Sequence, residues 1–468
     1  MSKHGQGVKG VLDLTQGKPL PLIFKFSLPL VAGTIFQQLY SFVDTIMVGR
    51  LVGQGALAAV GTTYSLNFLI LGFVQGCSVG FAIPLAKKIG ARNREEFQHY
   101  FWNGCWLSIF LALALSFGSV GFSPFLLNMI QTPQEILAAA NQYIQIILAG
   151  IPFSFLFNYG SAVLRAGGDS RRPTLFLVGS SVLNILLDYI LIDWFQAEIA
   201  GAAWATVTAQ GISGLLNFWW IFTKTDLLAH SKKQTSWSFH HIRVLAKVGL
   251  PMGFEYSVSA LGAIVMQSAI NSMGSLVIAG QTTGEKIRQM LTLPMESVGM
   301  AMATYAGQNE GAHKPNRILE GIRAGLTIQL IYCAVMWVLV FVGRQFMTDL
   351  VLGSDGGQAA AYSNQYLMIM SWLFFLHGSL MIVRNTLQGM GYSLQAVLSG
   401  LGEVTGRAVG SFAAVHGLGF VGIALANPFA WLLALVYCSI MVMIYLRPRL
   451  KTGKRKPDFQ DNSIQAAS

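Results

Sequence analysis

Charged side chains are scarce in this chain of 468 residues, of which only 11% are Asp, Glu, Lys or Arg. Soluble domains carry about 25% charged residues, so the chain has too little charge to cover a surface that faces water. Hydrophobic residues make up 53% of it. The composition excludes a soluble globular domain, a disordered chain and a secreted disulfide scaffold, and it indicates a surface that faces lipid.

Cysteine pairs and motifs for metal, nucleotide or catalysis are also lacking. The four cysteines lie in separate apolar segments without CxxC spacing, so they predict neither disulfides nor a zinc site. The eight histidines form no HExxH pattern, and no Walker A motif occurs. We therefore expect no metal site, no cofactor, no enzyme activity and no use of ATP by this chain.

Long apolar runs are what the chain does have. A membrane-spanning helix needs about 20 predominantly apolar residues, and breaks at Gly, Pro and Asn divide the apolar runs into segments of that length. We predict an all-α polytopic membrane protein with twelve transmembrane helices, at residues 20–46, 57–86, 98–123, 138–162, 173–193, 200–223, 245–271, 276–305, 319–343, 362–387, 394–416 and 421–446.

The 31 lysines and arginines are concentrated in alternate connections between these spans and at the two ends of the chain. Cytoplasmic loops collect Lys and Arg, so we expect both termini on the cytoplasmic side of the plasma (inner) membrane. The same placement disfavours nucleic acid as a partner, in spite of a net charge of +11. We expect a monomer surrounded by membrane lipid.

An internal repeat organises the chain. LRAGGDS at 164–170 aligns with LQGMGYS at 387–393, and GALAAVG at 55–61 aligns with GSLVIAG at 274–280. Repeats of this kind indicate a duplicated bundle, and the two halves commonly enclose a cavity. We predict two six-helix bundles related by this repeat, with the following boundaries: an N-terminal tail at 1–19, bundles at 20–223 and 245–446, a linker at 224–244 and a basic tail at 447–468.

Several motifs resemble those of the MATE (multidrug and toxin extrusion) transporters. They are FVDTIMVGRLVG in the first span, LRAGGDS, LNILLDYILI at 183–192 and AGQNEGA at 306–312. The resemblance implies a secondary antiporter that exports amphiphilic, cationic small molecules while H⁺ or Na⁺ enters. The alternative is a lipid-linked oligosaccharide flippase of similar architecture. Because a flippase needs a cationic cavity, carboxylates without a central basic cluster disfavour it.

Acidic residues at membrane depth mark a candidate site, since each costs about 2.5–3.5 kcal/mol there. Asp44 lies late in the first span, and Asp188 lies in the fifth span with Asn184 one helical turn before it, on the same face. Their oxygens suit a hard cation or an exchangeable proton. The alternative is that Asp188 only hydrogen-bonds a neighbouring helix or lies near the outer interface.

The resemblance adds further residues to this site. It implies a coupling set of Asp44, Asn184, Asp188 and a threonine of the sixth span, which is Thr206 here, with Thr208 as the alternative. It also implies that the first helix bends at Pro29. The alternative is a purely structural proline, of the kind that membrane helices tolerate.

The second bundle offers Glu255 and Glu296 as candidates for coupling. One branch of the resembled family pairs a glutamate near Glu255 with an aspartate of the tenth span to hold sodium. This chain has NTLQGMGY at 385–392 and no aspartate in span ten. That departure favours protons over sodium as the coupling ion.

Three other charges of the second bundle predict structural roles. Glu403 and Arg407 are four residues apart, in the favourable order for a helical ion pair. Arg384, near the predicted cytoplasmic end of span ten, is expected to set topology.

Overall fold

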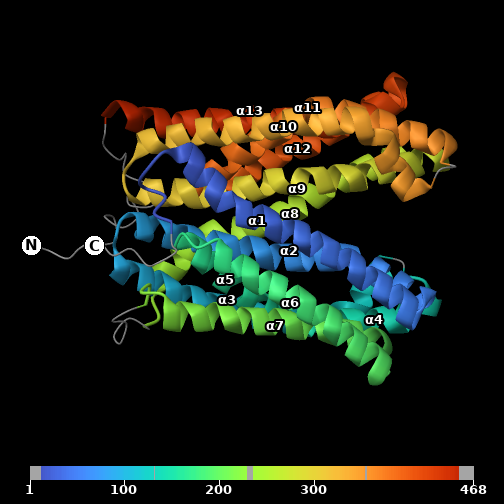
Figure 1. The fold of residues 1–468 in the computed structure, drawn as a ribbon, viewed down its shortest axis with the longest axis horizontal. Helices are drawn as coiled ribbons and strands as arrows, with labels where there is room; N and C mark the ends of the chain where they lie inside the picture. The colour runs from blue at the N-terminus through green and yellow to red at the C-terminus, as the bar shows by residue number, and fades with distance from the viewer. Residues whose placement is uncertain (1–11, 131, 229–235, 354–355, 453–468) are drawn as a thin grey trace, which may run out of the picture. The chain divides into compact units, whose positions relative to one another are not determined.

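The computed structural model describes residues 12–130, 132–228, 236–353 and 356–452, and helices are the only regular elements within those ranges (Figure 1). The helices are α1 (Pro19–Met47), α2 (Gln54–Gly90), α3 (Arg94–Met129), α4 (Gln134–Ala149), α5 (Ile151–Ala166), α6 (Arg171–Tyr189), α7 (Glu198–Lys224), α8 (Phe239–Asn271), α9 (Ser275–Gly311), α10 (Pro315–Leu352), α11 (Gly357–Gly389), α12 (Ser393–Ala413) and α13 (Phe420–Thr452). Three π-helical turns follow α1, α6 and α12, namely η1 (Val48–Val52), η2 (Ile190–Trp194) and η3 (Ala414–Leu418).

Each predicted span coincides with a helix, except the fourth, which is two helices. There α4 and α5 meet at Gly150 with a bend of 45°. In the described part of the chain, nine helices are long and apolar enough to cross a membrane by themselves, and α4 with α5 makes a tenth span. The helices that fall short are α9 and α12, which contain Glu285, Arg288, Glu296, Glu403 and Arg407 within their apolar stretches.

The chain divides into two compact units. The first contains Met1–Asp13, Lys25–Ala86 and Asn93–Leu261, and the second contains Leu14–Phe24, Lys87–Arg92 and Gly262–Ser468. The domain boundaries expected from the sequence stay a prediction. Parts of the expected tails and linker, at 1–11, 229–235 and 453–468, lie outside the described residues.

The internal repeat is visible in local geometry. Helices α2 and α9, which carry the aligned motifs GALAAVG and GSLVIAG, are both 37 residues long. Gly168 and Gly391 hold equivalent positions in LRAGGDS and LQGMGYS, and their φ angles are +95° and +90°. Glycine adopts this left-handed conformation without steric cost. Both halves therefore make the same turn at the same place.

Small residues let two helices of the first unit cross closely. A Cβ atom at Gly76 of α2 would collide with the carbonyl oxygen of Met252, and one at Gly80 would collide with the Cα atom of Gly249. Glycines at a spacing of four are typical of tight contacts between membrane helices. This contact ties the first part of α8, up to Leu261, to the first unit.

Candidate functional site

The first candidate site is on helix α6, where the buried residues follow a helical spacing. Ser181, Asn184 and Asp188 are at most 4% exposed, whereas Val182 and Leu186 are exposed. Residues three and four positions apart share one face of a helix, so α6 turns its polar side chains inward and its apolar ones outward. Asp188, with no exposed surface, is held inside the unit.

Asn184 connects this carboxyl group to helix α7. In the amide orientation that satisfies both ends of its side chain, Asn184 donates to Asp188 Oδ2 over 3.1 Å and accepts from the backbone N–H of Thr206 over 3.0 Å. Thr206 is half-buried, whereas Thr208 is exposed. Of the two threonines that the sequence offered, only Thr206 lies at the site.

The carboxyl groups of Asp44 of α1 and Asp188 lie close enough to act on each other's charge. Two carboxylates this close repel each other when both are ionised, so a proton or another cation at the pair is favoured. The Oδ1 atoms of both residues are buried and have no hydrogen-bond partner. In the described chain, no basic side chain is among the groups that act on either charge.

Two tyrosines that the sequence did not single out complete the site. Tyr40 lies one helical turn before Asp44, and its hydroxyl group lies close to the side chain of Thr206. Tyr143 of α4 is buried and lies close enough to both carboxyl groups to interact with their charges. The spacing of four between Tyr40 and Asp44 was the signal that could have identified the first of them. Nothing in the sequence pattern marked Tyr143.

The second unit holds a different arrangement, in which carboxylates are matched with arginines. Glu403 of α12 accepts from two guanidinium groups, that of Arg384 over 2.6 Å and that of Arg407 over 3.2 Å. Arg407 also donates to Asn427 of α13 over 2.9 Å. The expected pair of Glu403 and Arg407 is present. Arg384 is 9% exposed and is paired with Glu403, so it belongs to this network; its expected role in topology stays a prediction.

The polar chain continues from Asn427 through α11 to α9. Asn427 donates to the hydroxyl group of Tyr366 over 3.4 Å, and this hydroxyl donates to Glu285 over 2.6 Å. Glu285 binds Arg288 through both of its oxygens, at 2.5 and 2.8 Å. Four helices of the second unit are therefore joined by one network of alternating charge.

The expectation that the chain lacks a central basic cluster is wrong for this unit. Arg288, Arg384 and Arg407 lie in the same network, although they are far apart in the sequence and on three different helices. Only the folded arrangement brings them together. Two of the arginines share Glu403 and the third pairs with Glu285, so the cluster is largely compensated.

The two other candidate acids occupy different units. Glu255 is half-buried on the part of α8 that belongs to the first unit, whereas Glu296 is on α9 in the second. Glu296 lies 3.9 Å from His377 Nε2. Pro29 lies inside a continuous α1, and its carbonyl oxygen accepts from the hydroxyl group of Thr174 over 3.1 Å.

The AGQNEGA motif anchors the segment that precedes α1. The backbone N–H of Leu14 donates to Gln308 over 3.2 Å, and Asn309 donates to the Leu14 carbonyl oxygen over 3.1 Å. Arg317 donates to Asn309 over 3.1 Å and to the Gly17 carbonyl oxygen over 2.9 Å. The motif therefore fixes the start of α1 against the ends of α9 and α10.

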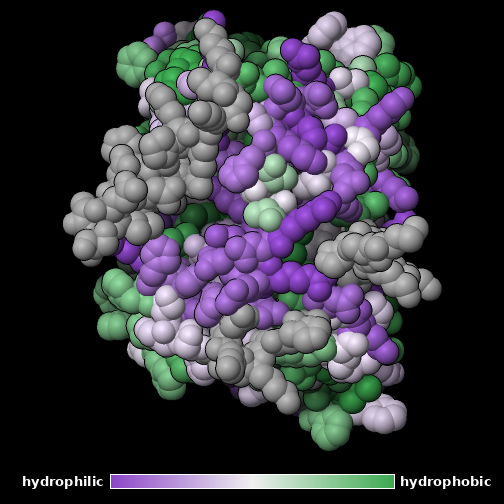
Figure 2. Space-filling view, turned by 90° about the vertical axis from the view of Figure 1, so that its left-hand side faces the viewer, coloured by the Kyte–Doolittle hydropathy of each residue, from purple (hydrophilic) through white to green (hydrophobic). Residues whose placement is uncertain are grey.

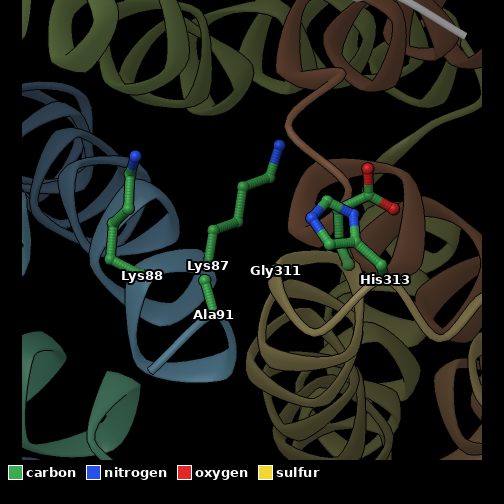
Figure 3. A pocket seen from close by; sticks show the side chains of 6 residues that line it. Lys87, Lys88, Ala91, Gly311 and His313 are labelled. Atoms are coloured by element: carbon green, nitrogen blue, oxygen red, sulfur yellow. The ribbon is translucent and has the colours of Figure 1, made fainter. Parts of the chain in front are cut away.

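A small basic pocket lies beside this anchor, where α2 and α9 end (Figure 3). Its volume is about 150 Å³, and its lining residues are Lys87, Lys88, Ala91, Glu310, Gly311 and His313. Glu310 pairs with Arg449 over 2.5 Å. Figure 2 shows hydrophilic residues gathered on the end of the molecule that it faces. The side of the membrane on which this end lies stays a prediction.

Comparison with known proteins decides the family. The MatE family model matches residues 29–190 and 251–403. The chain belongs to the MatE family. The two matched segments contain both candidate acid sites, and they cover one stretch in each half of the repeat. This is the family that the motifs resembled, and the protein is a multi-pass integral membrane protein with the MATE fold.

Individual relatives agree with this placement. The chain is 28% identical over 391 residues to "Probable multidrug resistance protein YpnP" of Bacillus subtilis, covering 83% of this chain and 86% of that protein. It is 22% identical to an "FAD transporter" of Shewanella oneidensis, covering 77% and 79% of the two chains. A MATE crystal structure in the bent conformation superposes with a TM-score of 0.88 at 22% identity, covering 96% of this chain and all of that one.

Proposed function

We propose that this MATE protein is a proton-coupled antiporter that exports amphiphilic, cationic small molecules. The observation that supports it most directly is the proximity of two buried acids, Asp44 and Asp188, whose mutual repulsion favours a proton at the pair. The two acids have no basic partner among the described residues, so a proton or a substrate cation is what can balance their charge. Competition between the two for the same acids couples their movements reciprocally.

Protons suit this site better than sodium does. A hard cation is bound by several oxygen ligands at once, whereas here one Asp188 oxygen receives the Asn184 amide and the carboxyl groups face each other. The sequence also lacks the span-ten aspartate of the sodium-binding branch. We infer that Asp44, Asn184, Asp188 and Thr206 form the protonation site, with the hydroxyl group of Tyr40 beside Thr206.

The membrane arrangement belongs to the same proposal. We infer a monomer in the plasma membrane with both termini in the cytoplasm, a first helix that bends at Pro29 during transport, and no catalytic step or cofactor. The basic residues around the AGQNEGA anchor would then face the cytoplasm, where Lys and Arg accumulate.

Efflux driven by separate gradients tests the proposal. Everted vesicles that contain the protein should accumulate tetraphenylphosphonium when a pH gradient is imposed, and should not do so with a sodium gradient alone. Asp188→Asn should abolish the accumulation. Asp193→Asn is the matched control, because Asp193 is exposed in the π-helical turn that follows α6. Accumulation driven by sodium alone, or by neither gradient, would contradict proton antiport.

A second candidate substrate class is an anionic compound, and the observation that favours it is the cluster of Arg288, Arg384 and Arg407. The relative named as an FAD transporter and the alternative of a lipid-linked oligosaccharide flippase both involve phosphate groups. The same vesicles should therefore be offered FAD beside tetraphenylphosphonium. Proton-driven movement of FAD alone would favour the anionic class.

A further inference from the structure

We propose that Glu296 and His377 form a second proton-exchange site, in the second unit and separate from Asp44 and Asp188. The inference rests on the proposed function, because it assigns another coupled proton to the same antiporter. Glu296 and His377 are not members of the hydrogen-bonded network of Glu285 and Glu403.

Glu296 is exposed, whereas the residues next to it on α9 are buried. Its side chain is 50% exposed, whereas Met295 and Ser297 on either side have no exposed surface. A carboxylate that faced lipid at this depth would cost about 2.5–3.5 kcal/mol. Polar groups inside membrane proteins face water-filled cavities or polar partners for this reason. The exposed half of Glu296 therefore faces water, from which it can take a proton.

His377 lies next to Glu296 and is buried. The residue is 6% exposed, its ring packs on Trp431 with centroids 4.8 Å apart, and neither ring nitrogen has a hydrogen-bond partner. Its Nε2 atom lies 3.9 Å from Glu296 Oε1, which is beyond hydrogen-bond distance. A protonated Glu296 carries an O–H donor, so a small movement of its side chain would satisfy the imidazole.

The charged groups that act on this pair come from α9, α11 and α12. Arg288 of α9 and Arg384 of α11 act on Glu296, and Arg407 of α12 acts on His377 as well. Glu285 and Glu403 are the counter-ions of these arginines. From α10 and α13 the neighbours are uncharged: the Gln329 amide, the Tyr332 hydroxyl group and the Trp431 ring.

Protonation of Glu296 removes one negative charge from a pair on which Arg288, Arg384 and Arg407 act. A cationic substrate would therefore be attracted more strongly by the ionised state than by the protonated one, so proton uptake would favour its release.

Infrared difference spectra of the purified protein in lipid nanodiscs, recorded between pH 8 and pH 5, test the site without any substrate. Protonation of Glu296 should appear as a carboxylic-acid band that Glu296→Gln removes and Glu296→Asp shifts. The matched control is Glu320→Gln, which replaces an exposed glutamate of α10 and should leave that band unchanged. A Glu296→Gln spectrum identical to that of the wild type overturns the proposal.

His377→Phe keeps a ring against Trp431 and removes the hydrogen-bond acceptor. It should move the midpoint of the Glu296 band to lower pH, by about tenfold in proton concentration, and it serves as the test if Glu296→Gln does not fold. An unchanged midpoint would contradict the role of His377. Asp188→Asn should remove a different band. If a pH gradient does not drive efflux by the wild-type protein while Glu296→Gln removes its band, the proposed function fails and this site stands.

Discussion

The buried acids of the two units differ in the partners that surround them. In the first, Asp44 and Asp188 meet each other and no arginine or lysine among the described residues. In the second, Glu285 and Glu403 are each bound by arginine side chains at 2.5–3.2 Å. A paired buried charge mainly holds helices in place, and removing one partner is costly. An unpaired acid remains available to a mobile cation, so the comparison separates residues that stabilise from residues that transport.

The largest effect is expected at Glu403. Glu403→Gln would leave Arg384 and Arg407 without their shared counter-ion, at a cost of about 3–5 kcal/mol in the free energy of unfolding. We expect a lower Tm and less folded protein in detergent, measured by fluorescence-detected gel filtration. Glu320→Gln is the control, since Glu320 is exposed. A Tm equal to that of the wild type would show that the network does not hold the unit together.

Asp44→Asn should have the converse effect. Its replacement removes a charge that has no basic partner, so the Tm should stay within a few degrees of the wild-type value. Proton-driven efflux should fall about 100-fold, within the range of coupling energies between linked sites. Asp193→Asn should change neither quantity. Loss of folding without a specific loss of coupling would place Asp44 with the structural charges of the second unit.

The threonines of α7 allow a smaller, matched comparison. Thr206→Val removes the hydroxyl group that lies beside Tyr40, and the loss of one hydrogen-bonding group at a buried site costs about 1 kcal/mol. The pH midpoint of efflux should shift by about fivefold in proton concentration. Thr208→Val, on the exposed side of the same helix, should leave it unchanged. Equal shifts for the two variants would remove Thr206 from the site.

The smallest effect on stability is expected for substitutions of Asp169, in the turn before α6 that recurs in the second half of the chain. Asp169 accepts from the backbone N–H groups of Arg171 and Arg172 at 3.1 Å each, and the equivalent residue in the second half is Tyr392. Burial raises the pKa of the Asp169 carboxyl group, so its charge is not what favours the fold. Asp169→Ala should cost about 1 kcal/mol, whereas Asp169→Asn, which keeps the acceptor, should cost little. Thermal unfolding distinguishes the two.

The sequence predicted the helices well because each span leaves a long apolar run. It could not show that the fourth span bends at Gly150, since a glycine in an apolar run is compatible with a straight helix. The spacing of Asn184 and Asp188 identified one face of the acid site, and the family resemblance supplied Thr206. Tyr143 was missed because it reaches the site from another helix.

The arginine cluster was missed for a related reason. Arg288, Arg384 and Arg407 lie on three helices, and each taken alone suggests a loop anchor or a local pair. Helix packing decides which charges meet, and no periodicity within a single helix records it. The helices with the weakest apolar character, α9 and α12, were nevertheless a visible sign that charge is placed inside the second unit.

The central claim is tested most directly by two transport measurements on Asp188→Asn, one of exchange without a pH gradient and one of accumulation driven by a pH gradient. In proteoliposomes, Asp188→Asn should still exchange tetraphenylphosphonium across the membrane by counterflow, although more slowly than the wild type, because Asp44 remains to attract the cation. The same variant should fail to accumulate the cation against its gradient when a pH difference is imposed. Wild-type accumulation by Asp188→Asn would contradict the claim that the unpaired acids of the first unit couple protons to export.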